Sequence, residues 1–156
     1  MSSKNVSTLR VSSARKVQFI DITSDISDFV RKSGVADGIC FIHVPHTTAG
    51  VTINENADPD VVADMITALE HIVPSHRGYL HAEGNSPAHV KSSLIGCSEK
   101  IFVSAGKLLL GTWQGIYFCE FDGPRSRKAH LKIVEGRNMS SRTRRRRDPG
   151  TNKIIM

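Results

Sequence analysis

The residues of this sequence best suited to chemistry are its histidines, of which there are seven. They are His43, His46, His71, His76, His81, His89 and His130. Imidazole is the commonest ligand of transition metals, and three converging imidazoles are the usual minimum for an open, reactive metal site. Their spacing matches no zinc-finger pattern, so ordinary surface or core histidines satisfied by hydrogen bonds are the alternative interpretation.

Local context favours three of these histidines as metal ligands. His46 comes at the end of an apolar strand and before a small polar turn, where side chains leave the core. His81 lies in a glycine-bounded loop beside Glu83, which could orient His81, act as a general base or simply be solvated. His89 falls in the first turn of an expected helix, whose positive end disfavours protonation of the ring. His43, inside the strand, is interpreted as structural.

The start of that same helix is also suited to binding an anion. Ser86 and Pro87 are typical of a helix cap and a first helical position, and the first N–H groups of a helix can hold phosphate. Lys91 and Ser92 follow about one turn later. This helix start could therefore hold an anion such as phosphate.

Further polar side chains fall at the boundaries of expected elements. Glu55 and Asn56 follow a short strand, and they either line a site or cap the next helix. Trp113 and Gln114 lie in a glycine-bounded loop, where the ring could stack on a flat ligand, although packing alone would also explain it. Glu120 lies inside an apolar strand, where an unpaired carboxylate is costly, so we expect it to pair with an arginine or a ligand.

Apolar periodicity and capping residues predict the elements that position these side chains. Strands are expected over 16–23, 38–44 and 51–54. The run over 38–44 is continuously apolar, which favours a central strand covered on both faces. Helices are expected from Thr23 or Ser24 to Gly34, from Asp58 to Pro74, and from Ser86 to Gly96. Four strands after residue 100 then predict a compact α+β domain, mostly antiparallel sheet with two to three helices, while residues 1–9 are expected to be loose.

The basic character of the chain is concentrated at its end. Of the 156 residues, 137–156 hold seven basic side chains and one acidic one, which accounts for the whole net charge of +6. We therefore predict a neutral folded domain over 1–136 and a basic, disordered tail over 137–156. A role of the tail as a nuclear localisation signal or as an RNA-contacting segment is left open.

The remaining composition indicates the cellular setting. The three cysteines have no CxxC spacing, and the first residues lack the apolar segment of a secretory signal. No apolar run approaches the roughly 20 residues that span a bilayer. We expect a cytoplasmic protein with reduced thiols and no membrane partner.

Three long segments of the chain resemble the YjbQ-like family, also called secondary thiamine-phosphate synthases. These segments are HTTAGVTINENADPDV (46–61), HAEGNSPAHVKSSLIG (81–96) and GKLLLGTWQGIYFCEFDGPR (106–125). The resemblance spans roughly residues 12–136, and it implies a compact α+β fold, a homotrimer with sites near the subunit interfaces, and a metal held by His46, His81 and His89. The substrate-binding candidates at or beside the family's motif positions are Thr47, Glu55, Asn85, Lys91, Trp113 and Gln114.

The resemblance also implies a reaction, in which a thiazole phosphate nitrogen displaces pyrophosphate from an aminopyrimidine methyl diphosphate. Departure of diphosphate needs positive charge, which a divalent metal, Lys91 and a helix start could supply. Three imidazoles favour zinc, although this chemistry commonly uses magnesium held by carboxylates. Two alternatives stay open: a metal-assisted hydrolase or lyase with Glu83 as base, and a non-enzymatic trimeric binding protein.

Overall fold

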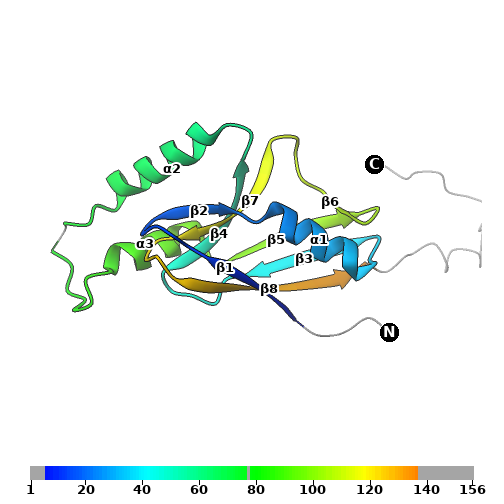
Figure 1. Ribbon diagram of the computed structural model, residues 1–156, viewed down its shortest axis with the longest axis horizontal. Coiled ribbons are helices and arrows are strands. Elements are labelled where there is room, and N and C mark those ends of the chain that lie inside the picture. Colours follow the sequence, from blue (N-terminus) through cyan, green and yellow to red (C-terminus); the bar gives the residue numbers. More distant parts are fainter. Residues whose placement is uncertain (1–5, 77, 137–156) are drawn as a thin grey trace, which may run out of the picture.

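Two antiparallel sheets pack face to face and form most of the fold (Figure 1). The structure, a computed structural model, describes residues 6–76 and 78–136, so the predicted basic tail lies outside the described residues. The larger sheet comprises, in spatial order, β1 (Ser7–Ser12), β8 (Ser126–Glu135), β3 (Gly38–His43), β5 (Ser98–Ser104) and β6 (Lys107–Leu108). The smaller sheet comprises β2 (Gln18–Asp21), β7 (Gln114–Glu120) and β4 (Ala49–Glu55).

Three helices accompany the sheets: α1 (Thr23–Ser33), α2 (Pro59–Ile72) and α3 (Ser86–Ile95). The predicted α+β class, antiparallel pairing and helix number are confirmed, although the strands form two sheets instead of one. None of the helices in the described part of the chain is long and apolar enough to cross a membrane.

The main core lies between the two sheets. Val11 and Ile42 of the larger sheet meet Phe118 of the smaller one there, and Ile26 and Val30 of α1 are buried with them. A second core lies on the other face of the smaller sheet, against α2 and α3. Its buried members are Phe19, Ala88, Tyr117, Cys119 and Phe121. The smaller sheet is therefore covered on both of its faces.

The prediction that the apolar strand over 38–44 is covered on both faces is wrong. β3 is central, between β8 and β5, but its burial alternates. Cys40 and Ile42 point into the core, whereas Phe41 and His43 are exposed. The strand that is buried on both faces is β7, because α2 and α3 pack on the smaller sheet and not on the larger one.

The expectation that residues 1–9 are loose is wrong for the part that the structure describes from Ser7 onward. β1 pairs along its whole length with β8, from Ser7 opposite Leu131 to Ser12 opposite Ser126. Only Leu9 and Val11 face inward, so this edge strand carries too short an apolar pattern to stand out in the sequence.

Local signals set the ends of the helices. Asp58 caps α2 as predicted, because its Oδ1 accepts a hydrogen bond from the N–H of Asp60 at 2.9 Å. Gly34 ends α1 in the left-handed conformation, with φ of 70°. The other two caps were predicted one residue or more too late, since Ile22 precedes α1 and Asn85 precedes α3 without a side-chain capping bond.

Helix α2 is the least buried of the three helices. Its apolar stripe is only half-buried, and none of its residues is fully buried. The stripe consists of Val62, Met65, Ile66 and Leu69. Figure 1 shows α2 running at a distance from the strands, connected to α3 by a long loop.

Candidate functional site

Two of the three predicted metal ligands lie together. The ring centroids of His81 and His89 are 5.5 Å apart, with the rings inclined at 77°. Two imidazoles on one tetrahedral zinc ion place their centroids about 5 Å apart, given a Zn–N distance of about 2 Å. The carboxylate of Glu83 lies 3.8 Å from Nε2 of His81. The loop before α3 and its first turn therefore present a pair of imidazoles at a separation that suits one metal ion.

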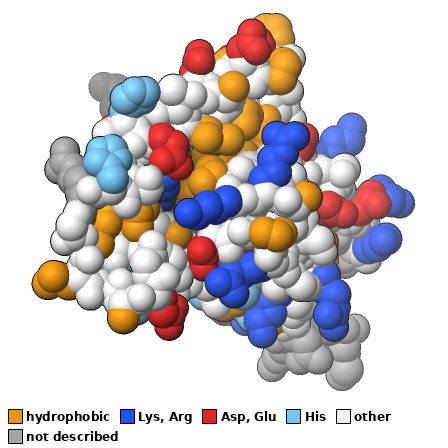
Figure 2. Space-filling model, turned by 60° about the vertical axis from the view of Figure 1, so that its left-hand side comes forward, with side chains coloured by type: hydrophobic (Ala, Val, Ile, Leu, Met, Phe, Trp, Pro, Cys, Tyr) orange, Lys and Arg blue, Asp and Glu red, His pale blue; other side chains and the backbone are white. Residues whose placement is uncertain are grey.

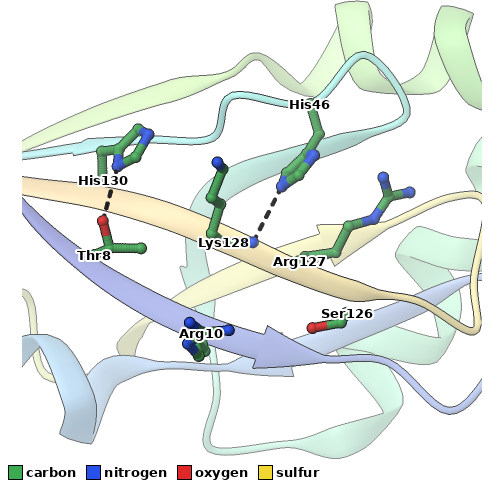
Figure 3. A pocket seen from close by; sticks show the side chains of 7 residues that line it. All are labelled: Thr8, Arg10, His46, Ser126, Arg127, Lys128 and His130. Carbon is green, nitrogen blue, oxygen red and sulfur yellow. Dashed lines mark hydrogen bonds between the residues drawn. The ribbon is translucent and has the colours of Figure 1, made fainter.

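The third predicted ligand, His46, lies elsewhere. β3 and β8 pair as far as His43 and His130, after which the chain of β3 leaves the sheet. The backbone N–H of Lys128 then donates to Nε2 of His46 at 3.0 Å (Figure 3). Within residues 6–76 and 78–136, no group of three or more His, Cys, Asp or Glu side chains is placed to hold a metal ion.

The environment of His46 favours its neutral form. Burial lowers the pKa of His46, and the positive charge of Arg127 lowers it further, against a smaller opposing effect of Glu120. A neutral ring has an unprotonated nitrogen, which the bond from Lys128 requires. His46 thus has a structural partner already, whatever further role it has.

A pocket of about 270 Å³ opens at the start of α3. Its polar lining residues are Lys16, Glu70, Ser75, Asn85, Lys91 and Asp122. The side chain of Lys91 is only 4% exposed, and its ammonium group forms an ion pair with Glu70 of α2. Figure 2 shows apolar side chains gathered in the middle of one face of the molecule, with cationic and acidic groups next to them. A buried cation in a pocket is a favourable position for binding an anionic group.

Asn85 connects this pocket to the strands. Its Nδ2 donates to Asp122 at 3.2 Å, and Asp122 also forms an ion pair with Arg125 at 2.8 Å. Burial alone would raise the pKa of Asp122, but the hydrogen bonds from Asn85 and Arg125 lower it overall. The other side-chain atom of Asn85, Oδ1, is buried without a hydrogen-bond partner among the described residues. A bound ligand with a donor group would satisfy this oxygen.

The helix start itself offers fewer donors than its sequence suggests. The N–H groups of Ala88 and His89 both donate to the carbonyl oxygen of Asn85, and Pro87 has none. Ser92, predicted to help hold an anion, instead donates from its buried hydroxyl to the carbonyl of Ala49 at 2.7 Å. The positive charge at this pocket therefore comes chiefly from lysine side chains.

Three of the substrate-binding candidates lie at the opposite end of the smaller sheet. Glu55 pairs with Gln114 in the register of β4 and β7, whereas Ala49 pairs with Glu120 at the other end. Seven residues of strand span about 20 Å, which separates the two ends. Trp113 is 63% exposed beside Gln114. The described chain does not bring Glu55, Trp113 and Gln114 to the pocket at α3.

Thr47 lies in the turn between β3 and β4, and it is exposed. Its neighbour Thr48 is buried and accepts a hydrogen bond from Arg127 at 2.8 Å. Gly50, at the end of the HTTAG motif, has no room for a side chain, because a Cβ there would lie 2.6 Å from the carbonyl oxygen of Gly96. This turn is therefore packed directly against the end of α3.

Sequence reasoning missed three charged residues of the α3 pocket. Asp122 lies within the DGPR part of the third motif, and that context could have indicated it. Lys16 and Glu70 come from segments far from α3 along the chain, and no local pattern indicates their role.

The sequence pattern of the family described as UPF0047 protein YjbQ-like matches residues 7–136 of this chain. The chain belongs to the YjbQ family. A UPF0047 protein of Methanocaldococcus jannaschii is 53% identical over 125 residues, covering 80% of this chain and 91% of that protein. The UPF0047 protein YugU of Bacillus subtilis is 48% identical over 128 residues, covering 81% of this chain and 97% of YugU.

Solved structures of YjbQ-family proteins share the fold. A Clostridium acetobutylicum protein of the family is 53% identical and superposes with a TM-score of 0.80, covering 81% of this chain and 98% of that one. A Sulfolobus solfataricus protein described as YbjQ-like is 33% identical, with a TM-score of 0.81, covering 85% of this chain and 97% of its own. The fold expected from the resemblance is confirmed.

Proposed function

We propose that this YjbQ-family chain is a metal-dependent enzyme that acts on a phosphorylated small molecule in the pocket at the start of α3. The observation that carries the proposal is the buried Lys91, whose charge is matched by Glu70 of another helix at a pocket. Burying a lysine is costly, so a partner and a use for its charge are expected. The His81–His89 pair lies on the same helix and the loop before it.

In this proposal the phosphate lies against Lys91 and Lys16, and Asn85 orients the substrate through its unpartnered Oδ1. Positive charge beside a departing diphosphate lowers the barrier to its loss. The reaction that fits the family resemblance is transfer of the whole aminopyrimidinylmethyl group from its diphosphate to the ring nitrogen of a thiazole phosphate, with pyrophosphate as leaving group. The ammonium group of Lys91 would leave Glu70 and pair instead with the negative charge that develops on the departing diphosphate.

His81 and His89 are the residues that would hold the metal, and their separation suits two ligands of one ion. Imidazole ligands favour zinc over magnesium. Such an ion would supply positive charge to the phosphate oxygens. The third ligand, His46, would reach this site from a second copy of the chain, in the homotrimer that the resemblance implies.

A second candidate function is metal-assisted hydrolysis or elimination. The position of Glu83, with its carboxylate 3.8 Å from His81, favours it. A carboxylate at this distance can orient the imidazole or take a proton from water. Replacement of Glu83 by Gln separates the two functions, because only the hydrolytic reaction uses Glu83 as a base.

Metal analysis of the purified protein tests the shared premise. His81→Ala and His89→Ala should each lose most of the bound metal, and His46→Ala should lose it if a second copy completes the site. His71→Ala is the matched control, because His71 is an exposed histidine of α2 bonded to its own helix. Full metal content in all of the first three variants would show that the proposed site is wrong.

The proposed substrate class is tested by measuring the rate at which the purified protein forms thiamine phosphate from the aminopyrimidine diphosphate and the thiazole phosphate. Lys91→Met should abolish turnover, whereas Lys32→Met, which changes an exposed lysine of α1, should not. The double variant Glu70→Gln with Lys91→Met controls for folding, because it leaves no unpaired charge. Turnover that survives in a folded Lys91→Met variant would exclude this role for Lys91.

A further inference from the structure

The charged groups that line the α3 pocket are of both signs. Lys16 and Lys91 are cationic, whereas Glu70 and Asp122 are carboxylates. The apolar lining residues are Val17, Pro87, Ala88 and Phe121. The pocket, of about 270 Å³, is of a size for a small molecule. A simple phosphate would match the two lysines and would leave the two carboxylates facing a bound anion.

One of the two carboxylates is held by groups that a ligand at Lys91 does not disturb. Asp122 accepts hydrogen bonds from Nδ2 of Asn85 at 3.2 Å and from Nη2 of Arg125 at 2.8 Å. Its backbone N–H also donates to the buried Glu120 at 2.9 Å. Asp122 therefore keeps its partners, and its charge stays balanced, when the pocket is occupied.

The other carboxylate, that of Glu70, depends on the group that a phosphate would take. Among the described residues, its hydrogen-bond donor is the ammonium group of Lys91. The Lys91 side chain is only 4% exposed, whereas that of Glu70 is 44% exposed, so Glu70 is the member of the pair with room to turn. A phosphate that displaces Glu70 from Lys91 leaves an unpaired carboxylate beside the bound anion, and like charges at short range repel each other.

We propose that the ligand of this pocket is a phosphate ester that also carries a cationic nitrogen, and that Glu70 is the residue that selects it. The inference rests on the proposed function, in which the phosphate lies against Lys91. Binding then exchanges one ion pair for two: the phosphate pairs with Lys91, and the cationic nitrogen of the ligand pairs with Glu70. No charge is left unmatched, in contrast to the binding of a simple anion.

The test compares two ligands that differ in a single ammonium group, O-phosphoethanolamine and ethyl phosphate. Isothermal titration calorimetry on the full-length protein, at one pH and one salt concentration, gives the two dissociation constants. Phosphoethanolamine has the smaller net negative charge, so a pocket that recognises only the anion would bind it more weakly. We expect it to bind about fivefold more tightly, which corresponds to one partly exposed ion pair.

Variants of Glu70 test which residue makes this distinction. Glu70→Gln should remove the preference for phosphoethanolamine, whereas Glu70→Asp, which keeps the charge, should retain part of it. Asp28→Asn is the matched control, because it removes the carboxylate of an exposed ion pair on α1 and should leave the preference unchanged. If Glu70 only held Lys91 in place, Glu70→Gln would weaken both ligands alike, and an unchanged ratio would overturn its role in selection.

Lys91→Met separates this inference from the proposed function. It should weaken both ligands, because both place their phosphate against Lys91. Binding of both ligands that is indifferent to Lys91→Met would show that the proposed function is wrong about this lysine. If both ligands require Lys91 but bind equally, or if ethyl phosphate binds more tightly, only the inference about the cationic nitrogen is wrong. This comparison is made first in the unchanged protein, so it does not depend on how any Glu70 variant folds.

Discussion

Glu120 of β7 and Arg127 of β8 form a buried, bidentate ion pair that joins the two sheets. Nε and Nη2 of Arg127 donate to the two carboxylate oxygens of Glu120 at 2.7 and 2.6 Å. The carboxylate also accepts bonds from Ser13 Oγ and from the N–H groups of Phe121 and Asp122. The pair was expected from the position of Glu120 in an apolar strand, and the structure identifies its partner.

Removing one member of this pair should be strongly destabilising. Arg127→Met leaves a buried carboxylate without its cation, and we expect the free energy of unfolding to fall by about 3–5 kcal/mol. Urea-induced unfolding measures this loss. Arg125→Ala, which breaks the more exposed pair with Asp122, should cost about 1 kcal/mol or less. Equal losses in the two variants would contradict a special role of the buried pair.

The same pair should make stability depend on pH. Burial raises the pKa of Glu120, but bonds from Arg127, the backbone of Asp122 and Ser13 outweigh it, so the pKa is lowered in the folded protein. A lowered pKa stabilises the fold above the pKa of a free glutamate, about 4.3, and this stability is lost as pH falls through the lower value. The unfolding free energy of the unchanged protein should therefore fall, relative to that of Glu120→Gln with Arg127→Met, as the pH drops below about 4.3. A constant difference would contradict this prediction.

His46 should titrate below the ordinary range of histidine. Burial is the main cause, followed by the charge of Arg127, and the lowered pKa means that the folded protein favours the neutral ring. The stability that this ring contributes is present above about pH 6.5 and is lost as the pH falls through its lower folded pKa. Proton NMR measures the midpoint of the ring signal, which His46→Gln identifies by its absence. A midpoint at or above 6.5 would be inconsistent with the bond from Lys128.

One thiol should react in the folded protein and three in the unfolded protein. Cys40 and Cys119 are buried, and Cys97 is exposed. Burial raises the pKa of Cys40 to about 11, and it raises that of Cys119 further. Because the thiolate is the reactive form, a disulfide reagent should modify Cys97 alone within minutes at pH 8. Cys97→Ser should remove this fast phase; a fast phase that persists would mean that a buried thiol is accessible.

The helices were predictable from the sequence because their signals are local. The Asp58–Pro59 cap, the Pro74 stop and the Gly34 terminus act within one turn, and each appears in the structure. β1 was missed because it depends on pairing with β8, more than a hundred residues away. The two-sided burial was assigned to the wrong strand, since an apolar run such as that of β3 does not reveal which sheet the helices cover.

The candidate site was predictable only in part for the same reason. His81, Asn85, His89 and Lys91 lie within one short segment, so their proximity follows from the chain itself. Glu70 reaches Lys91 from another helix, and its role depends on how α2 packs. The position of His46, which accepts a hydrogen bond from Lys128 and forms no metal cluster within the described residues, depends on where β3 leaves the larger sheet.

The shallow packing of α2 has an electrostatic consequence. A helix without a single fully buried residue opens at a low free-energy cost, and its amide hydrogens should exchange before those of β7. Every opening that carries Glu70 away leaves Lys91 with an unmatched charge at the pocket. When α2 is in place, the Lys91–Glu70 pair has no net charge. When α2 opens, Lys91 remains at the pocket as an unpaired cation. The hydrophobic contact of α2 with the smaller sheet thus sets how strongly the pocket attracts an anion.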